Sequence, residues 1–148
     1  MALFPDISVP NPNIVNTGSS TQITYGREPD FDFTTGEFIL QDGKPKVVDG
    51  PDALRVWITK ALLTTRYRWP IYSSAFGCEL EDIIGFDLPR AVLESEIPRF
   101  VREALIYDDR IEDVKDFVVE RGADWLKVTF TVVTFDGQTL RQGVTYNV

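Results

Sequence analysis

One stretch of the chain, residues 53–85, constrains the fold most, because it joins an amphipathic helix to a dense set of aromatic residues, arginines and glycines. Apolar side chains recur there at spacings of three and four and predict one buried helix face: Leu54, Trp57, Ile58, Ala61 and Leu62. Asp49, Gly50 and Pro51 provide a helix start. The β-branched pair before Arg66 predicts an end near Thr65. The segment is therefore a core-forming helix.

Aromatic residues dominate the segment that follows this helix. They are Tyr67, Trp69, Tyr72 and Phe76, with Ile71 among them. We expect them to cover the mouth of a core, while Arg66 and Arg68 point the other way. A ligand-binding aromatic box is the alternative interpretation.

The C-terminal third changes to a period of two, which predicts two half-buried strands over residues 125–135 and 138–148, and residues 111–121 precede them as a third strand. Asp136 and Gly137 form a dipeptide typical of a two-residue type I′ turn. Three consecutive antiparallel strands form a meander, and its last strand is expected at the sheet edge.

Two further segments complete the expected architecture. Residues 30–40 alternate Phe and Asp around Thr-Thr-Gly, which predicts a short hairpin, and residues 88–110 have a helical stripe that Pro98 should kink or restart as a new helix. The predicted fold class is α+β. It has an N-terminal β-hairpin and two to four helices packed on one face of a C-terminal three-stranded antiparallel sheet.

Length and composition predict one domain. The chain has 148 residues, 43% of them hydrophobic, and room for a single core. Residues 1–29 read as an extended N-terminal arm, either an inert terminus or a segment that lies along a neighbour, and residues 30–148 as the α+β domain. With no apolar run of about 20 residues and no signal-like N-terminus, we expect a soluble, unsecreted chain without membrane partners.

The residue inventory excludes several kinds of site. The chain has no histidine and a single cysteine, Cys78, so zinc sites and Ser-His or Cys-His pairs are excluded and no cofactor or metal is expected. The net charge of −8, without a cluster of cations, argues against nucleic acid as a partner.

Carboxylates leave one enzymatic alternative open, a glycoside hydrolase, which needs two carboxylates about 5–9.5 Å apart with one pKa raised. The available carboxylates are Glu79, Glu81, Asp82, Glu94, Glu96, Glu103 and Asp108. Most lie in segments of polar helical periodicity, where a solvated face is expected. A small regulatory binding domain is a third possibility, with no specific feature in its favour.

The segment TTRYRWPIYSSAFGCELEDIIG resembles the central motif of the XkdS-like family of PBSX-type phage baseplate proteins. In that family a Thr-x-x-Tyr and an Ile-Tyr-Ser precede an aromatic-Gly and a Glu-Leu. The flanking blocks DFDFTTGEF and REALIYDDRIEDVKDF are also similar, so the resemblance covers residues 30–148. The family is related to the wedge proteins of contractile tails that initiate the sheath, a group often labelled lysozyme-like.

The resemblance implies a structural role without catalytic residues. Several copies around the tail axis would join the baseplate wedge to the tail tube and initiate sheath assembly. The implied partners are other wedge proteins, sheath subunits and tube proteins, and the implied location is a virion or tail-like particle, with the host cytoplasm during assembly. The broader group has a Glu-Pro-Arg motif after its last helix, whereas this chain has Asp108, Asp109 and Arg110, so that only the arginine matches.

Two surfaces are the predicted protein contacts. Asp109 and Arg110 form the first, because a bidentate guanidinium can bind a carboxylate of this chain or of a neighbour. The second is the open edge of the final strand, which has one charged residue, Arg141, and no proline. Its predicted contact residues are Gln138, Leu140, Gln142, Val144, Tyr146 and Val148. The resemblance implies that arms of sheath subunits complete a shared sheet there; an edge covered by the chain's own N-terminal arm is the alternative.

Overall fold

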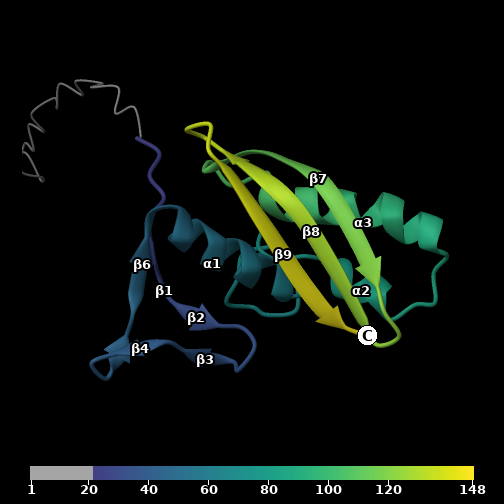
Figure 1. The fold of residues 1–148 in the computed structure, drawn as a ribbon, viewed down its shortest axis with the longest axis horizontal. Helices are drawn as coiled ribbons and strands as arrows, with labels where there is room; N and C mark the ends of the chain where they lie inside the picture. Colours follow the sequence, from purple (N-terminus) through teal and green to yellow (C-terminus); the bar gives the residue numbers. More distant parts are fainter. Residues whose placement is uncertain (1–21) are drawn as a thin grey trace, which may run out of the picture.

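Six short strands, three helices and three long strands follow one another in the computed structural model, which describes residues 22–148 (Figure 1). They are β1 (Arg27–Pro29), β2 (Phe31–Asp32), β3 (Glu37–Phe38), β4 (Leu40–Gln41), β5 (Lys44–Pro45), β6 (Val47–Asp49), α1 (Gly50–Leu63), α2 (Leu80–Ile84), α3 (Arg90–Leu105), β7 (Ile111–Arg121), β8 (Trp125–Thr134) and β9 (Thr139–Asn147). The predicted α+β class is confirmed.

The C-terminal strands form the predicted antiparallel meander in the order β7-β8-β9, with β9 at one edge. β8 and β9 pair without interruption from Trp125↔Asn147 to Val133↔Thr139. The other edge strand, β7, has two register shifts, and Asp116 in the second has a φ of 56°. Bulges of this kind protect a sheet edge from pairing with another strand, whereas β9 has neither a bulge nor a register shift.

The turn between β8 and β9 has a different type from the predicted one. A type I′ turn requires positive φ at both central residues. Gly137 has φ 81°, but Asp136 is not among the positive-φ residues. Thr134 N–H donates to the Gln138 carbonyl, which makes Phe135, Asp136 and Gly137 a three-residue loop. The predicted turn type is therefore wrong, because Phe135 leaves the ladder to join the loop.

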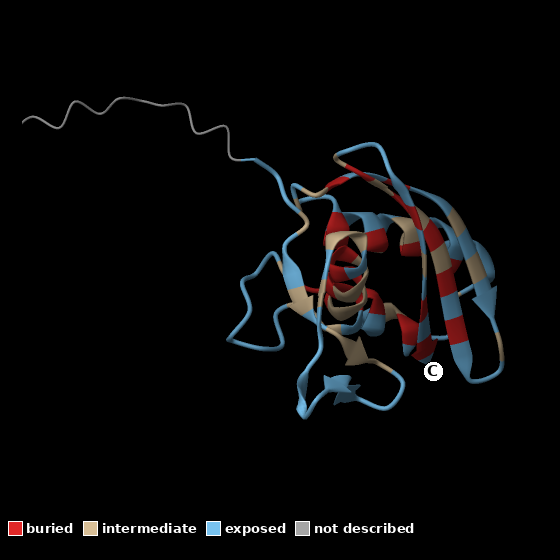
Figure 2. Cartoon of the chain, turned by 60° about the vertical axis from the view of Figure 1, so that its left-hand side comes forward, coloured by how far each residue is buried: buried red, intermediate tan, exposed pale blue. Residues whose placement is uncertain are grey.

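One hydrophobic core lies between the sheet and the helices, which cover the same sheet face (Figure 1). Figure 2 shows buried and exposed residues alternating along the strands. The helices contribute Leu54, Ile58, Ile97 and Val101, and the sheet contributes Val114, Val128, Phe130 and Val132. The predicted apolar face of α1 is buried in full.

The short N-terminal strands extend from α1 as paired ribbons. β1 pairs with β6, and both pack against α1. β2 and β3 form the predicted hairpin, in which Phe31 faces Phe38. β4 and β5 are joined by Asp42 and Gly43, both with positive φ, as a type I′ turn requires.

The structure bears on three predicted boundaries. α1 ends at Leu63 with Thr64 as its C-cap, close to the predicted end near Thr65, and of the two alternatives at Pro98 no new helix starts there, because α3 continues through it as one helix. The predicted arm of residues 1–29 includes β1, while its residues 1–21 lie outside the described residues.

Candidate interaction surface

The open side of β9 presents backbone groups of every second residue. Gln138 accepts from Thr134 and Val148 donates to Asp124, so the even-numbered residues bond to β8 along this unshifted ladder. Since the two sides of a strand alternate, the N–H and C=O groups of the odd-numbered residues point away from β8. The carbonyl of Arg141 agrees, because it accepts a hydrogen bond from a side chain of α1.

Side chains on β9 divide in the same way. Of the predicted contact residues, Leu140, Val144 and Tyr146 are buried against the helices, and Gln142 is half-buried. Gln138 and Val148 are exposed. The predicted residues thus lie on the core side of the strand or at its ends, and the outward backbone belongs to their neighbours Thr139, Arg141, Gly143, Thr145 and Asn147.

α1 lies along β9 and is hydrogen-bonded to it at three positions. Arg55 Nη1 donates to the Arg141 carbonyl at 2.8 Å, and Gln142 Nε2 donates to Thr59 Oγ1 at 2.8 Å. Further along, the buried Tyr146 hydroxyl donates to the Leu62 carbonyl at 3.0 Å. Burial raises the pKa of Tyr146 well above its usual value, so the phenol remains a donor. Sequence reasoning missed Arg55 because nothing in the local pattern links it to the sheet.

A hollow of about 320 Å³ opens beside the last residues of β9. Thr145, Tyr146 and Asn147 form one wall. The remaining lining comes from five apolar residues, Leu62, Leu63, Cys78, Ile84 and Phe33, and from two polar ones, Thr65 and Glu81. Burial raises the pKa of the Cys78 thiol to about 11, so this cysteine is a neutral wall group rather than a nucleophile.

Arg110 binds within its own chain. Its Nε and Nη2 each donate to a carboxylate oxygen of Asp108 at 2.9 Å, and its guanidinium lies 5.0 Å from the centroid of the Trp57 ring. Burial alone would raise the pKa of Asp108, but the hydrogen bonds and charge of Arg110 outweigh it and hold that pKa below its usual value. Asp109, in contrast, is exposed. Of the two predicted contact residues, only Asp109 has an exposed side chain.

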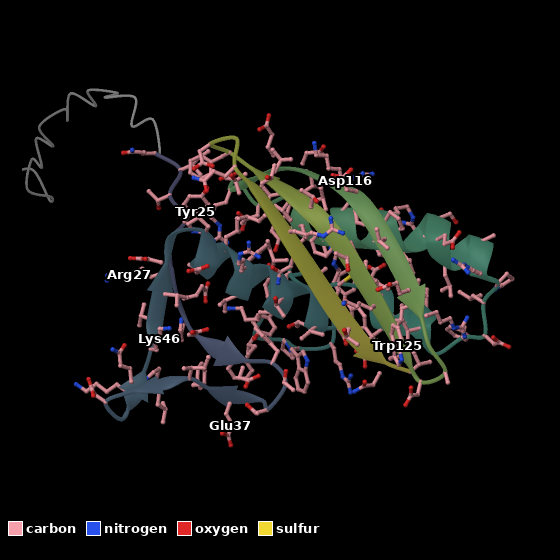
Figure 3. The ribbon with its side chains drawn as sticks, viewed as in Figure 1. Tyr25, Arg27, Glu37, Lys46, Asp116 and Trp125 are labelled. Carbon is pink, nitrogen blue, oxygen red and sulfur yellow. The ribbon has the colours of Figure 1, made fainter. Side chains whose placement is uncertain are left out.

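The same arginine fixes the start of the described chain. Arg110 Nη1 donates to the Tyr25 carbonyl at 2.8 Å. The Tyr25 hydroxyl donates to Asp136 in the β8–β9 turn at 2.7 Å, and its ring lies 5.1 Å from that of Phe135. Figure 3 shows Tyr25 at this end of the sheet and Trp125 at the opposite end. The chain therefore enters the domain beside the turn that begins β9.

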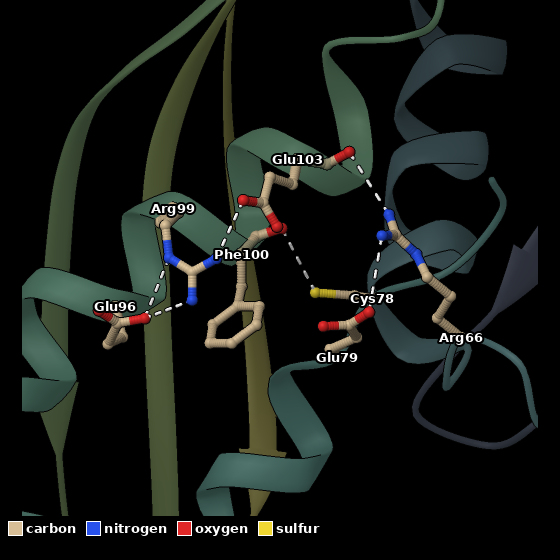
Figure 4. A network of polar contacts seen from close by, with 7 residues as sticks. All are labelled: Arg66, Cys78, Glu79, Glu96, Arg99, Phe100 and Glu103. Carbon is tan, nitrogen blue, oxygen red and sulfur yellow. Dashed lines mark hydrogen bonds and ion pairs between the residues drawn. The ribbon is translucent and has the colours of Figure 1, made fainter.

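The candidate catalytic carboxylates are held by arginines or exposed. Arg99 binds both Glu96 and Glu103, and Arg66 lies near Glu79 (Figure 4). Glu94 pairs with Arg90, Glu81 accepts from Thr65, Asp82 is exposed, and Asp108 pairs with Arg110. A glycosidase acid needs a raised pKa, whereas that of Asp108 is lowered. In the described part of the chain, no cluster of three potential metal ligands occurs.

The aromatic segment after α1 was predicted to cover the core, and this prediction is wrong for its first half. Tyr67, Trp69 and Ile71 have exposed fractions of 71%, 54% and 84%. Only Phe76 packs inward, against Trp57. The loop is closed at its base, where Cys78 N–H donates to the Thr64 carbonyl and Arg66 N–H to the Cys78 carbonyl.

Among residues 22–148, no helix combines the length and the apolar character that a bilayer crossing requires.

Comparison with known proteins identifies similar chains. Residues 27–137 match the family described as contractile injection system sheath initiator. The phage-like element PBSX protein XkdS of Bacillus subtilis (strain 168) is 35% identical over 138 residues, which cover 93% of this chain and 92% of that protein. A tail lysozyme-like protein of Geobacter sulfurreducens, known from a crystal structure, superposes with a TM-score of 0.58 and 19% identity over 76% of this chain and 96% of its own. At that identity the likeness shows a shared fold alone.

Proposed function

The chain belongs to the contractile injection system sheath initiator family and is a structural component of phage-type tails. From this premise we propose that it joins the baseplate wedge to the tail tube and starts the sheath through the open edge of β9. The carrying observation is that edge. It has no register shift and no bulge, and the backbone groups of its odd-numbered residues point away from β8. A strand from a sheath subunit would extend the sheet by β-augmentation.

The proposed partners are sheath subunits at β9, wedge proteins at Asp109, and tube proteins, with several copies around the tail axis. Asp109 is an exposed carboxylate beside a hollow lined by residues 22–24 and 107–110, which suits a cationic group of a neighbour. Because β1 pairs with β6 inside the domain, we propose that only the segment before residue 22 of the predicted arm acts along a neighbour, that the chain after it acts as the wedge domain, and that assembly takes place in the host cytoplasm.

We also propose that the chain has no glycosidase activity. Six of the seven candidate carboxylates are engaged by arginine or threonine side chains, and the pKa of Asp108 is lowered, whereas a general acid needs a raised pKa. Purified protein is expected to release no soluble muropeptides from peptidoglycan. Release that a single Glu→Gln change abolishes would establish the enzymatic alternative instead.

The test of sheath initiation is removal of the gene from the particle's gene cluster and complementation with the intact chain. Electron microscopy is expected to show tubes or baseplates without sheath in the deletion strain and sheathed tails after complementation. Full-length sheaths on baseplates that lack the chain would contradict the proposal.

A further inference from the structure

In the first half of β9, the Arg55 side chain occupies the strand edge that faces away from β8. Arg55 Nη1 lies 2.8 Å from the Arg141 carbonyl and 3.3 Å from Gln142 Oε1. The Arg141 carbonyl is an outward acceptor, so Arg55 occupies the position that an N–H group of an added strand would take. Thr139 is the only outward residue of β9 before this point, and one residue is too short to pair a strand.

The second half of the edge is uncapped. Within residues 22–148, the outward N–H and C=O groups of Gly143, Thr145 and Asn147 make no hydrogen bond. These three residues, whose backbone groups all point outward, span five consecutive positions of β9, which is long enough to pair with a short strand. The free backbone groups thus begin directly after the position that Arg55 closes.

The hollow lies at this uncapped half. Thr145, Tyr146 and Asn147 line it on the strand side, and Leu62, Leu63 and Ile84 on the helix side. An added strand would place every second side chain toward the helix layer, as β9 itself does with Val144 and Tyr146.

The walls determine which side chain fits. Among the described residues that line the hollow, Glu81 is the only charged one, and its carboxylate already accepts from Thr65 and lies 3.8 Å from Arg68. Leu62, Cys78 and Ile84 are buried and Leu63 is 40% exposed. The volume of about 320 Å³ has room for one large apolar side chain and offers no unpaired charge to a polar one.

We propose that the docking site is only the second half of β9, residues 143–147, that it takes a short strand of a sheath subunit with one apolar side chain in the hollow, and that Arg55 is the stop that sets the register of this strand. This inference rests on the proposed function and narrows it. The strand is identified by chemistry, because an edge of free N–H and C=O groups is complementary to another extended backbone.

The test uses two matched proline variants in the full chain, Thr145→Pro and Thr139→Pro. Both residues are threonines on β9, both are exposed, and both have outward N–H groups, so neither change removes a bond to β8. Each variant complements the deletion strain, and sheathed tails are counted by electron microscopy. Thr145→Pro is expected to reduce sheathed tails at least tenfold, and Thr139→Pro to leave them near the parental number.

A third variant changes a side chain that lines the hollow and leaves the backbone of β9 unchanged. Leu63→Glu places a charge at the rim of the hollow on a 40% exposed side chain and is expected to reduce sheathing without unfolding the chain, as circular dichroism checks. If both prolines reduce sheathing and Leu63→Glu does not, the whole edge is used and this inference is wrong while the proposed function stands. If all three folded variants nucleate normally, strand addition at β9 itself is wrong.

Hydrogen exchange of the isolated full chain tests for two other occupants of the edge, the chain's own N-terminal segment and a second copy of the chain. The amides of Gly143, Thr145 and Asn147 are expected to exchange rapidly, and the chain to be monomeric by light scattering. Slow exchange that becomes fast when residues 1–21 are deleted would assign the edge to the chain's own N-terminal segment. A dimer that Thr145→Pro dissociates would assign it to a second copy. Either result overturns the inference.

Discussion

Arg110 and Asp108 are joined by two parallel hydrogen bonds, each 2.9 Å long, although only one residue separates them in the chain. Both side chains are about 15% exposed, and Arg110 uses its remaining terminal nitrogen for the Tyr25 carbonyl. One guanidinium therefore connects the end of α3, the start of β7 and the entry of the chain into the domain.

Replacement of Arg110 by lysine should destabilise the fold, because one ammonium group cannot reproduce the planar pair and the Tyr25 bond together. The expected loss is about 1–3 kcal/mol in the free energy of unfolding, as for hydrogen bonds to charged groups. Urea denaturation measures it. Arg99→Lys is the matched control, since Arg99 pairs with two glutamates at the surface and should change stability much less. Equal losses would contradict the prediction.

Acid should remove the same interaction. The pKa of Asp108 is lower in the folded chain than in the unfolded one, so the ion pair contributes stability above the unfolded value of about 4. That contribution disappears as the pH falls through the folded value. Asp108→Asn is therefore expected to be less stable than the parent at pH 7 and to approach it below pH 4 in urea denaturation. A constant difference across this range would exclude the linkage.

Alkali should act through Tyr146. Its pKa is raised by burial, so the neutral phenol stabilises the fold below the unfolded value of about 10, and this contribution is lost as the pH rises toward the folded value. Tyr146→Phe removes the bond to Leu62 and should cost about 0.5–1.5 kcal/mol at pH 7. Between pH 10 and 11 the parent should lose stability faster than the variant. Thermal unfolding at matched pH values would show parallel losses if the prediction is wrong.

The two tryptophans around the aromatic loop should respond differently to truncation. Trp57 is 9% exposed and packs against Phe76 and Tyr107, so Trp57→Ala should cost about 3–5 kcal/mol. Trp69 is 54% exposed, and Trp69→Ala should change the free energy of unfolding by about 0.5 kcal/mol or less. Denaturant midpoints of the two variants make the comparison, and similar midpoints would place Trp69 in the core.

Glycine substitutions test the β8–β9 turn. Gly137 has φ 81°, so Gly137→Ala should cost about 1 kcal/mol through a left-handed backbone although nothing lies near the added methyl group. Gly85 has φ −71° and equally open surroundings, so Gly85→Ala should be neutral or slightly stabilising. Thermal denaturation of both variants measures the difference. No loss at Gly137 would mean that the loop can change its conformation.

The elements predictable from sequence are those in which a local period reports burial. The core-facing side of β8 and β9 follows from alternation and the buried face of α1 from three-and-four spacing, because each pattern is repeated over several residues. The two Asp-Gly pairs show the limit of local signals. The pair at Asp42 forms the two-residue turn and the pair at Asp136 does not, since strand pairing on either side determines the loop length.

The candidate site was only partly predictable, for a similar reason. Alternation correctly indicates which β9 side chains face the core, but it does not report which backbone groups face β8. The pairing places Val144 N–H toward β8, so a proline at Val144 would break the sheet, whereas one at Thr145 would test the edge. Arg55 reaches Arg141 across 86 positions of sequence, a contact that no local pattern contains.

The alternation along β9 also determines how the strand would carry mechanical load. A strand added at residues 143–147 would run along β9, so a pull along the strand direction would load its hydrogen bonds together, in shear, rather than one after another. β9 would pass that load to α1 through Gln142 and Tyr146, whose side chains reach Thr59 and Leu62. The bonds that anchor the strand and the groups left free for a partner belong to different residues, so the joint could bear force without loosening the core that supports it.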